Sequence, residues 1–171
     1  MNLKNKYLMI ILAVIIIKTN FSINVQAKEY NRFNNISIED GLSQATVETM
    51  MQDSKGYIWL GTNDGLDRYN GYTFKKYSYE KGQENSLVNG YILDIKEDSE
   101  GNIWVATAAG ISKIYNNGEK VQNYTSDSES GNLSNDNTAT MLISSSNKIY
   151  VGTAEGINLY DKKTDKFTIT F

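Results

Sequence analysis

The sequence predicts an all-β protein made of tandem four-stranded antiparallel units. Three stretches within residues 53–160 repeat one phrase with small changes. Their central aromatic residues keep a nearly constant spacing, since Trp59 and Trp104 are 45 positions apart and Trp104 and Tyr150 are 46 apart. Tandem supersecondary units of this length are typical of β-propeller blades. With three copies, the prediction is an open, incomplete β-propeller of about three blades.

Each repeat contains four segments with strand character. The first alternates in polarity, and residues 47–52 place Val47, Thr49 and Met51 on one side. The second is apolar at consecutive positions, as in 58–60, which predicts burial on both faces by neighbouring blades. We expect blade 1 over 42–79, blade 2 over 87–126 and blade 3 over 133–171, preceded by an extra N-terminal strand within 30–41.

The repeated positions have structural interpretations. The turn from Asp53 to Gly56 begins with Asp and ends with Gly, which favours a side-chain-capped turn. Gly65 is expected at positive φ, Gly61 lets a neighbouring blade approach, and the hydroxyl of Thr62 can satisfy a turn amide. The structural repeat signature comprises Asp53, Gly56, Trp59, Gly61, Thr62, Gly65, Asp98, Gly101, Trp104, Thr107, Gly110, Tyr150, Gly152, Thr153 and Gly156.

Composition limits the chemistry. The 171 residues contain no cysteine, hence no disulfide or thiolate metal site, and no histidine, the commonest general base and zinc ligand. Catalysis would have to use carboxylates, Tyr, Lys or hydroxyls, and we expect no catalytic residue, metal or cofactor. The net charge is −3 without a Lys/Arg cluster, which argues against a nucleic-acid partner.

The first 27 residues have the pattern of a secretory signal peptide. Lys4 and Lys6 precede an apolar run over 7–17, and Val25 and Ala27 are small residues at the positions that a signal peptidase reads. The run is shorter than the ~20 apolar residues that span a bilayer. We expect cleavage after Ala27 and a secreted or extracytoplasmic chain; the alternative is an uncleaved anchor.

Several carboxylates and aromatic rings of the repeats are of residue types that also serve in functional sites. Asp53 and Asp98 open equivalent turns on neighbouring blades, which favours turn capping over catalysis. Asn63-Asp64-Gly65 resembles part of a calcium loop but lacks the alternating ligands and closing Glu. The repeated aromatic residues can stack on sugars, yet their place in a doubly buried strand favours core packing.

Propeller ligands usually meet the loops at one end of the central channel. By repeat symmetry, these loops are the links from fourth to first strand and from second to third strand. Their amides and hydroxyls suit a polyhydroxylated ligand, and they suit plain turns equally well. The candidate ligand-binding residues are Ser43, Gln44, Asn63, Asp64, Asn89, Ser134, Asn135 and Glu155.

The phrase Asp-Ser-x-Gly-x-Ile-Trp, followed by Leu/Val-Gly/Ala-Thr and Gly-Leu/Ile, resembles the two-component regulator propeller repeats. An opening Phe33-x-x-Ile-x-x-x-x-Gly-Leu-Ser43 adds to the resemblance, which covers residues 30–171. The third copy is degenerate, with Tyr150 in place of Trp. The resemblance implies the extracytoplasmic sensor part of hybrid histidine kinase-like receptors, which responds to an external ligand, often a carbohydrate.

The resemblance also implies what surrounds such a segment. Family sensors carry many more repeats, a further β-domain, a membrane helix and an output module. We therefore expect an amino-terminal piece of such a sensor, with the remaining blades of a parent receptor as partners and membrane tethering only there. The alternatives are a piece of a propeller enzyme, lyase- or lactonase-like, and a surface interaction module without signalling. Exposed faces of the terminal blades are expected to favour self-association.

Overall fold

The computed structural model describes residues 2–9, 35–127 and 132–170. Residues 3–9 form a helix within one compact unit, and residues from Asn35 onward form a second unit that carries the sheets. No helix in the described part of the chain is long and apolar enough to cross a membrane. The expected cleavage site after Ala27 lies outside the described residues.

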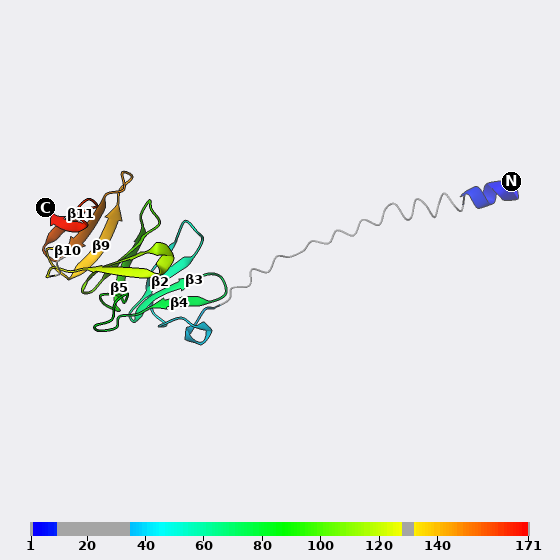
Figure 1. Cartoon of the computed structure of the whole chain (residues 1–171). Coiled ribbons are helices and arrows are strands. Elements are labelled where there is room, and N and C mark those ends of the chain that lie inside the picture. The colour runs from blue at the N-terminus through cyan, green and yellow to red at the C-terminus, as the bar shows by residue number, and fades with distance from the viewer. Residues whose placement is uncertain (1, 10–34, 128–131, 171) are drawn as a thin grey trace. The chain divides into compact units, whose positions relative to one another are not determined.

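The second unit consists of three four-stranded antiparallel sheets, here called blades 1, 2 and 3 (Figure 1). Blade 1 contains β1 (Val47–Gln52), β2 (Ile58–Thr62), β3 (Gly65–Tyr69) and β4 (Phe74–Tyr77). Blade 2 contains β5 (Ile92–Glu97), β6 (Ile103–Thr107), β7 (Gly110–Tyr115) and β8 (Lys120–Tyr124), with a short 3-10 helix, η2 (Asn116–Gly118), between β7 and β8. Blade 3 contains β9 (Thr138–Ile143), β10 (Ile149–Thr153), β11 (Gly156–Asp161) and β12 (Lys166–Ile169).

Strand order within each blade follows the chain, and the first strands lie innermost. β5 contacts β1 on one side and β9 on the other, so the blades pack in sequence around these inner strands. No sheet among the described residues closes on itself. The predicted open, partial propeller of about three blades is therefore confirmed.

A bulge in β1 changes one face assignment. Val47 pairs with Thr62 whereas Thr49 pairs with Gly61, the adjacent position of β2. Adjacent strand residues point to opposite faces, so Val47 and Thr49 also lie on opposite faces. Simple alternation placed them together, which is wrong because the extra residue shifts the register.

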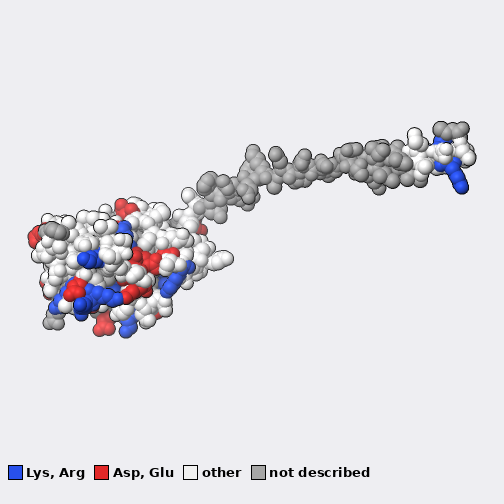
Figure 2. All heavy atoms as spheres, turned by 90° about the horizontal axis from the view of Figure 1, so that it is seen from above, with Lys and Arg blue, Asp and Glu red and all other residues white. Residues whose placement is uncertain are grey.

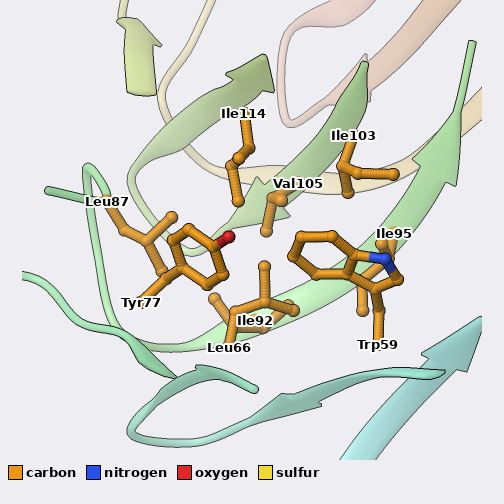
Figure 3. Close-up of a cluster of buried hydrophobic side chains, with 9 residues drawn as sticks. All are labelled: Trp59, Leu66, Tyr77, Leu87, Ile92, Ile95, Ile103, Val105 and Ile114. Carbon is orange, nitrogen blue, oxygen red and sulfur yellow. The ribbon is translucent and has the colours of Figure 1, made fainter. Parts of the chain in front are cut away.

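The apolar core lies between the blades rather than within one sheet. Trp59, Leu66 and Tyr77 of blade 1 pack against blade 2, whose contributing side chains include Val105 and Ile114 (Figure 3). A second cluster joins blades 2 and 3 through Trp104, Ala106, Ile111, Tyr124, Leu133, Met141, Ile149, Val151 and Phe167. All five residues of β6 are buried, as expected for a strand covered on both faces.

The outer faces of blades 1 and 3 expose apolar side chains. Met50 is 69% exposed, whereas the equivalent Ile95 and Met141 are 2% and 3% exposed. On blade 3, Leu142 and Ile157 are 61% and 41% exposed. The expected exposure of the terminal faces is thus confirmed for the described residues, and self-association through them stays a prediction.

The expected N-terminal strand is not found in its described part. Residues 30–34 lie outside the description, and Ile38–Asp40 form a 3-10 helix, η1. Ser37 and Asp40 form a reciprocal cap, and Gly41 ends the turn at φ 112°. This local capping closes a turn where the apolar spacing predicted an extended segment.

Charged side chains of both signs lie beside one another on the face of the sheet unit in Figure 2. No large patch of one sign is visible there, consistent with the scattered Lys and Arg positions of the sequence.

Candidate functional site

An aspartate opens the turn between the first two strands of blades 1 and 2 and anchors the tryptophan behind it. Asp53 accepts hydrogen bonds from two backbone N–H groups of the turn and, at 2.8 Å, from Trp59 Nε1. Asp98 repeats this arrangement with Trp104 Nε1, also at 2.8 Å. The predicted turn-capping role is confirmed. The bond to the indole was not predicted, although a buried Trp N–H usually needs such a partner.

The serines among the predicted ligand residues anchor the links that enter each blade. Ser43 donates its backbone N–H and its hydroxyl to the buried Asp67 carboxylate, both at 2.8 Å. In blade 3, the Ser134 N–H donates to Asn158 Oδ1 at 2.8 Å. Blade 2 uses Ser112 as the acceptor at the same place. These acceptors were not predicted. The sequence feature that marks them is a polar residue two positions after the glycine that begins each third strand.

Three further predicted residues bond their own loops. The side-chain oxygens of Asn89 and Asn135 each accept the backbone N–H two residues later at 2.8 Å, and Gln44 makes the same kind of bond to the Thr46 N–H. Asn135 Nδ2 also donates to Glu155 at 3.2 Å. Asn63, Asp64 and Glu155 are exposed.

The structure brings the two predicted loop sets to one end of the blades. The Gly65 N–H in the second-to-third turn of blade 1 donates to Gly90 O in the next link at 2.7 Å. In blade 3, the Ala154 N–H donates to Asn137 O at 2.9 Å. The predicted proximity of the loops is therefore correct, while their contact with a ligand stays a prediction. We call this the loop end.

A cavity of about 270 Å³ lies between blades 1 and 2 at the opposite end, where the Asp53 turn is. This cavity was not predicted from the sequence, because its walls come from non-equivalent positions of two repeats. Its lining includes Lys55, Tyr57 and Arg68 of blade 1 and Glu97, Ile114 and Asn117 of blade 2. The Arg68 guanidinium carbon lies 4.7 Å from the centre of the Tyr57 ring and 5.6 Å from that of Trp59.

The corresponding cavity between blades 2 and 3 is smaller, about 170 Å³. Lys113 occupies the position of Arg68, and Tyr160 occupies that of Ile114. The Lys113 ammonium lies 5.1 Å from the Trp104 ring centre and 3.4 Å from the Tyr160 hydroxyl. The larger side chain at the Ile114 position therefore occupies space that stays open between blades 1 and 2.

Burial and hydrogen bonding shift the pKa values of groups at both interfaces. Burial raises the pKa of Tyr77 to about 12, and its hydroxyl donates to Gly118 O at 3.1 Å. Burial also raises the pKa of Tyr124, which donates to Asp165 at 2.8 Å. Burial opposes ionisation of Asp165, but hydrogen bonds from Tyr160, Gln122 and Tyr124 outweigh it and lower the pKa of this carboxyl.

Side chains that could bind a metal do not form a cluster among the residues that the structure describes. No cluster of three or more His, Cys, Asp or Glu side chains lies in a position to hold an ion there. The cavity between blades 1 and 2 presents cationic, amide and aromatic groups.

Comparisons with known proteins agree with this architecture. The family model described as "Two component regulator propeller" matches residues 41–64 and 86–109, which contain the first two copies of the repeat phrase. Histidine kinase P4 of Formosa agariphila is 37% identical over 74 residues, which are 43% of this chain and 5% of that protein.

Solved structures give the same architecture. The extracellular domain of a hybrid two-component system from B. thetaiotaomicron matches 80% of this chain with a TM-score of 0.71 and 26% identity. This chain covers 20% of that domain. Virginiamycin B lyase from Staphylococcus aureus matches 75% of the chain and 42% of its own length, with a TM-score of 0.55 and 17% identity, which concerns the fold alone.

The fold and the repeats define an open portion of a β-propeller. The chain carries two repeats that match the two-component regulator propeller family, and the sequence and structure comparisons agree with that match.

Proposed function

We propose that this chain is a ligand-binding portion of an extracytoplasmic sensor propeller and that it is not an enzyme. The observation that carries the proposal is the likeness to the extracellular domain of a hybrid two-component system over 80% of the chain. The repeat family supports it, and so does a ligand-sized cavity between two blades.

Two regions of the chain are suited to ligand contact. The loop end presents the predicted amides and hydroxyls, although several of them already bond their own loops. The cavity between blades 1 and 2 combines an aromatic wall with cationic groups, which is typical of sites that bind small polar molecules. The lyase likeness, at 17% identity, gives no argument for lyase chemistry in this chain.

The binding proposal is tested with the full chain and a panel of neutral and charged small molecules. A ligand that binds the folded form raises the melting temperature by an amount that grows with the logarithm of its concentration above Kd. We expect at least one member of the panel to raise the melting temperature with this logarithmic dependence. If a panel covering sugars, sugar acids, amino acids and aromatic acids produces no shift and no change in NMR spectra, ligand sensing by this portion is wrong, and a surface interaction module is favoured.

The extracytoplasmic location is tested by expressing the chain in a bacterial host and determining the N-terminus of the product. We expect secretion with a mature chain that begins at Lys28, because the residues before it have the signal-peptide pattern. Retention of the intact N-terminus in the membrane fraction would favour the uncleaved anchor.

A further inference from the structure

We propose that the cavity between blades 1 and 2 binds the carboxylate of a small one-ring organic acid, and that Arg68 contacts this carboxylate. The inference rests on the proposed function, because it names the chemical class of the ligand and one site for it. It places the site away from the loop end at which sequence symmetry pointed.

The carboxylates of this cavity already have donors. Asp53 accepts three hydrogen bonds, from the N–H groups of Lys55 at 3.0 Å and Tyr57 at 2.9 Å and from Trp59 Nε1 at 2.8 Å. Glu97 accepts the backbone N–H and the hydroxyl of Ser54, both at 2.7 Å. These negative groups are thus engaged in holding the turn that forms one wall.

The cationic groups, in contrast, keep most of their donors. Arg68 has five N–H groups, and its one hydrogen bond to the described residues runs from Nη1 to Asn117 O at 3.2 Å. No carboxylate among the described residues forms an ion pair with it. Lys55 uses one donor on Asn117 Oδ1 at 2.6 Å. The cavity therefore has surplus donors, which a ligand with charged acceptors satisfies best.

Aromatic rings hold the guanidinium in place. It lies over the Tyr57 and Trp59 rings, at 4.7 Å and 5.6 Å from their centres, within the range of cation–π contacts. A guanidinium oriented in this way loses less conformational freedom when it binds a planar carboxylate with two parallel hydrogen bonds. The volume of about 270 Å³ lies near the lower end of the range for small-molecule pockets, which suits one ring with its substituents.

The second interface shows why the site is confined to the first. Its cation, Lys113, points to the Tyr160 hydroxyl at 3.4 Å, and Tyr160 itself bonds Asp165. Tyr160 also takes up the space that the smaller Ile114 leaves open between blades 1 and 2. We therefore expect one carboxylate site at the two interfaces between blades, and it lies between blades 1 and 2.

The test uses two pairs of probes that differ in the carboxylate: benzoate with benzyl alcohol, and glucuronate with glucose. Affinity is measured by calorimetry on the full chain, with tryptophan fluorescence as a second readout because Trp59 lines the cavity. We expect at least one acid to bind about tenfold or more tightly than its neutral partner, as is usual for a hydrogen-bonded charge. If neither acid exceeds its neutral partner, the proposal is overturned.

Variants taken from the repeats locate the site. Arg68→Met removes the charge but keeps a long side chain, and it should weaken binding of the acid about tenfold or more. Ile114→Tyr introduces the blade 3 residue at this position and should abolish binding by filling the cavity. The matched control, Lys113→Met, removes the same charge at the second interface and should leave the affinity within about twofold of the unmodified chain. Thermal melts verify that each variant is folded.

The outcomes separate this inference from the proposed function. Acid binding that survives both Arg68→Met and Ile114→Tyr places the site elsewhere and overturns the inference, while ligand binding by the chain stands. If only neutral molecules bind, the inference is likewise overturned, while ligand binding by the chain stands. Loss in the Lys113→Met control as great as in Arg68→Met would indicate a general charge effect and would also overturn it.

Discussion

The interface between blades 1 and 2 and the interface between blades 2 and 3 are two versions of one design. In both, an aspartate fixes a buried tryptophan through its indole N–H at 2.8 Å. In both, the apolar side chains of one blade cover the second strand of the next. They differ at the end near the aspartate turn. The first keeps a cavity of about 270 Å³, whereas the second places the Tyr160 ring there and leaves about 170 Å³.

This difference separates an interface whose polar groups stabilise the packing of blades 2 and 3 from the interface at which we propose binding. At the second interface, Tyr124 and Tyr160 both donate to Asp165, and their rings lie with Trp104 and Phe167 in one aromatic cluster. The polar groups there satisfy one another. At the first interface, Arg68 makes one hydrogen bond to the described residues and borders the larger cavity, where we propose that a ligand binds. A repeat can thus keep its core positions while its variable positions change the space and the polar groups at the interface.

The largest expected effect is the loss of a tryptophan. Truncation of a large buried aromatic side chain costs about 3–5 kcal/mol of unfolding free energy, so Trp59→Ala should fall in that range. Trp104→Ala should cost about 1 kcal/mol more, because Trp104 packs against Tyr124, Tyr160 and Phe167 whereas Trp59 stacks on Tyr77. Urea unfolding of the two variants measures the difference. Equal losses would mean that the aromatic cluster adds nothing beyond burial.

The next effect concerns the aspartates. Asp53→Ala and Asp98→Ala each leave a buried indole N–H and two turn N–H groups without their acceptor, at a cost of about 1–3 kcal/mol. Asp98→Ala should cost about 0.5–1 kcal/mol more than Asp53→Ala, because Asp98 also accepts the side-chain amide of Asn102 at 2.9 Å. Ser144, which opens the third turn by accepting the Lys148 N–H at 3.1 Å, offers a matched control, and Ser144→Ala should cost less because Tyr150 has no indole. A comparable loss there would show that turn capping alone accounts for the effect.

Much of this architecture followed from the sequence because it is periodic. The spacing of Trp59 and Trp104 predicted the blades, and the polarity pattern predicted the strands close to their observed bounds. The buried anchors Asp67 and Asn158 could have been found by the same alignment of copies. They were missed because short strands were judged by their apolar residues, and a buried polar group is explained only by its partner on a distant loop.

The cavity could not be predicted in this way. It depends on Ile114 of one repeat facing Arg68 of the preceding one, so it is a property of a pair of blades rather than of the repeat. The prediction of a strand in the described part of the N-terminal segment was wrong for a different reason. There, the cap between Ser37 and Asp40 outweighs a weak apolar spacing, and such local hydrogen bonding is poorly visible in a polarity pattern.

The small residue behind the second strand offers a way to compare a covered face with an open one. A Cβ on Gly61 would lie 2.6 Å from Ile92 Cγ2 and 2.7 Å from Thr49 Cγ2, so Gly61→Ala should cost about 1–3 kcal/mol through overpacking. At Gly152, the nearest atom to such a Cβ is Thr140 Cγ2 at 3.5 Å, and Gly152→Ala should change stability by less than about 0.5 kcal/mol. Thermal unfolding of the two variants measures both changes in stability. If Gly152→Ala is as damaging as Gly61→Ala, that face is covered in solution, as self-association would require.

The smallest effect is the acid sensitivity of the second interface. Hydrogen bonds from Tyr160, Gln122 and Tyr124 lower the pKa of Asp165 below its ordinary value of 3.8 against the opposing effect of burial. A carboxyl with a lowered pKa in the folded state stabilises the fold above its unfolded pKa, and this contribution is lost as the pH falls through the folded pKa. The unmodified chain should therefore lose stability below about pH 4 relative to Asp165→Asn, which cannot titrate. Unfolding free energies of the two chains between pH 3 and pH 7 provide the comparison, and parallel curves would show that the Asp165 carboxylate contributes nothing to joining blades 2 and 3.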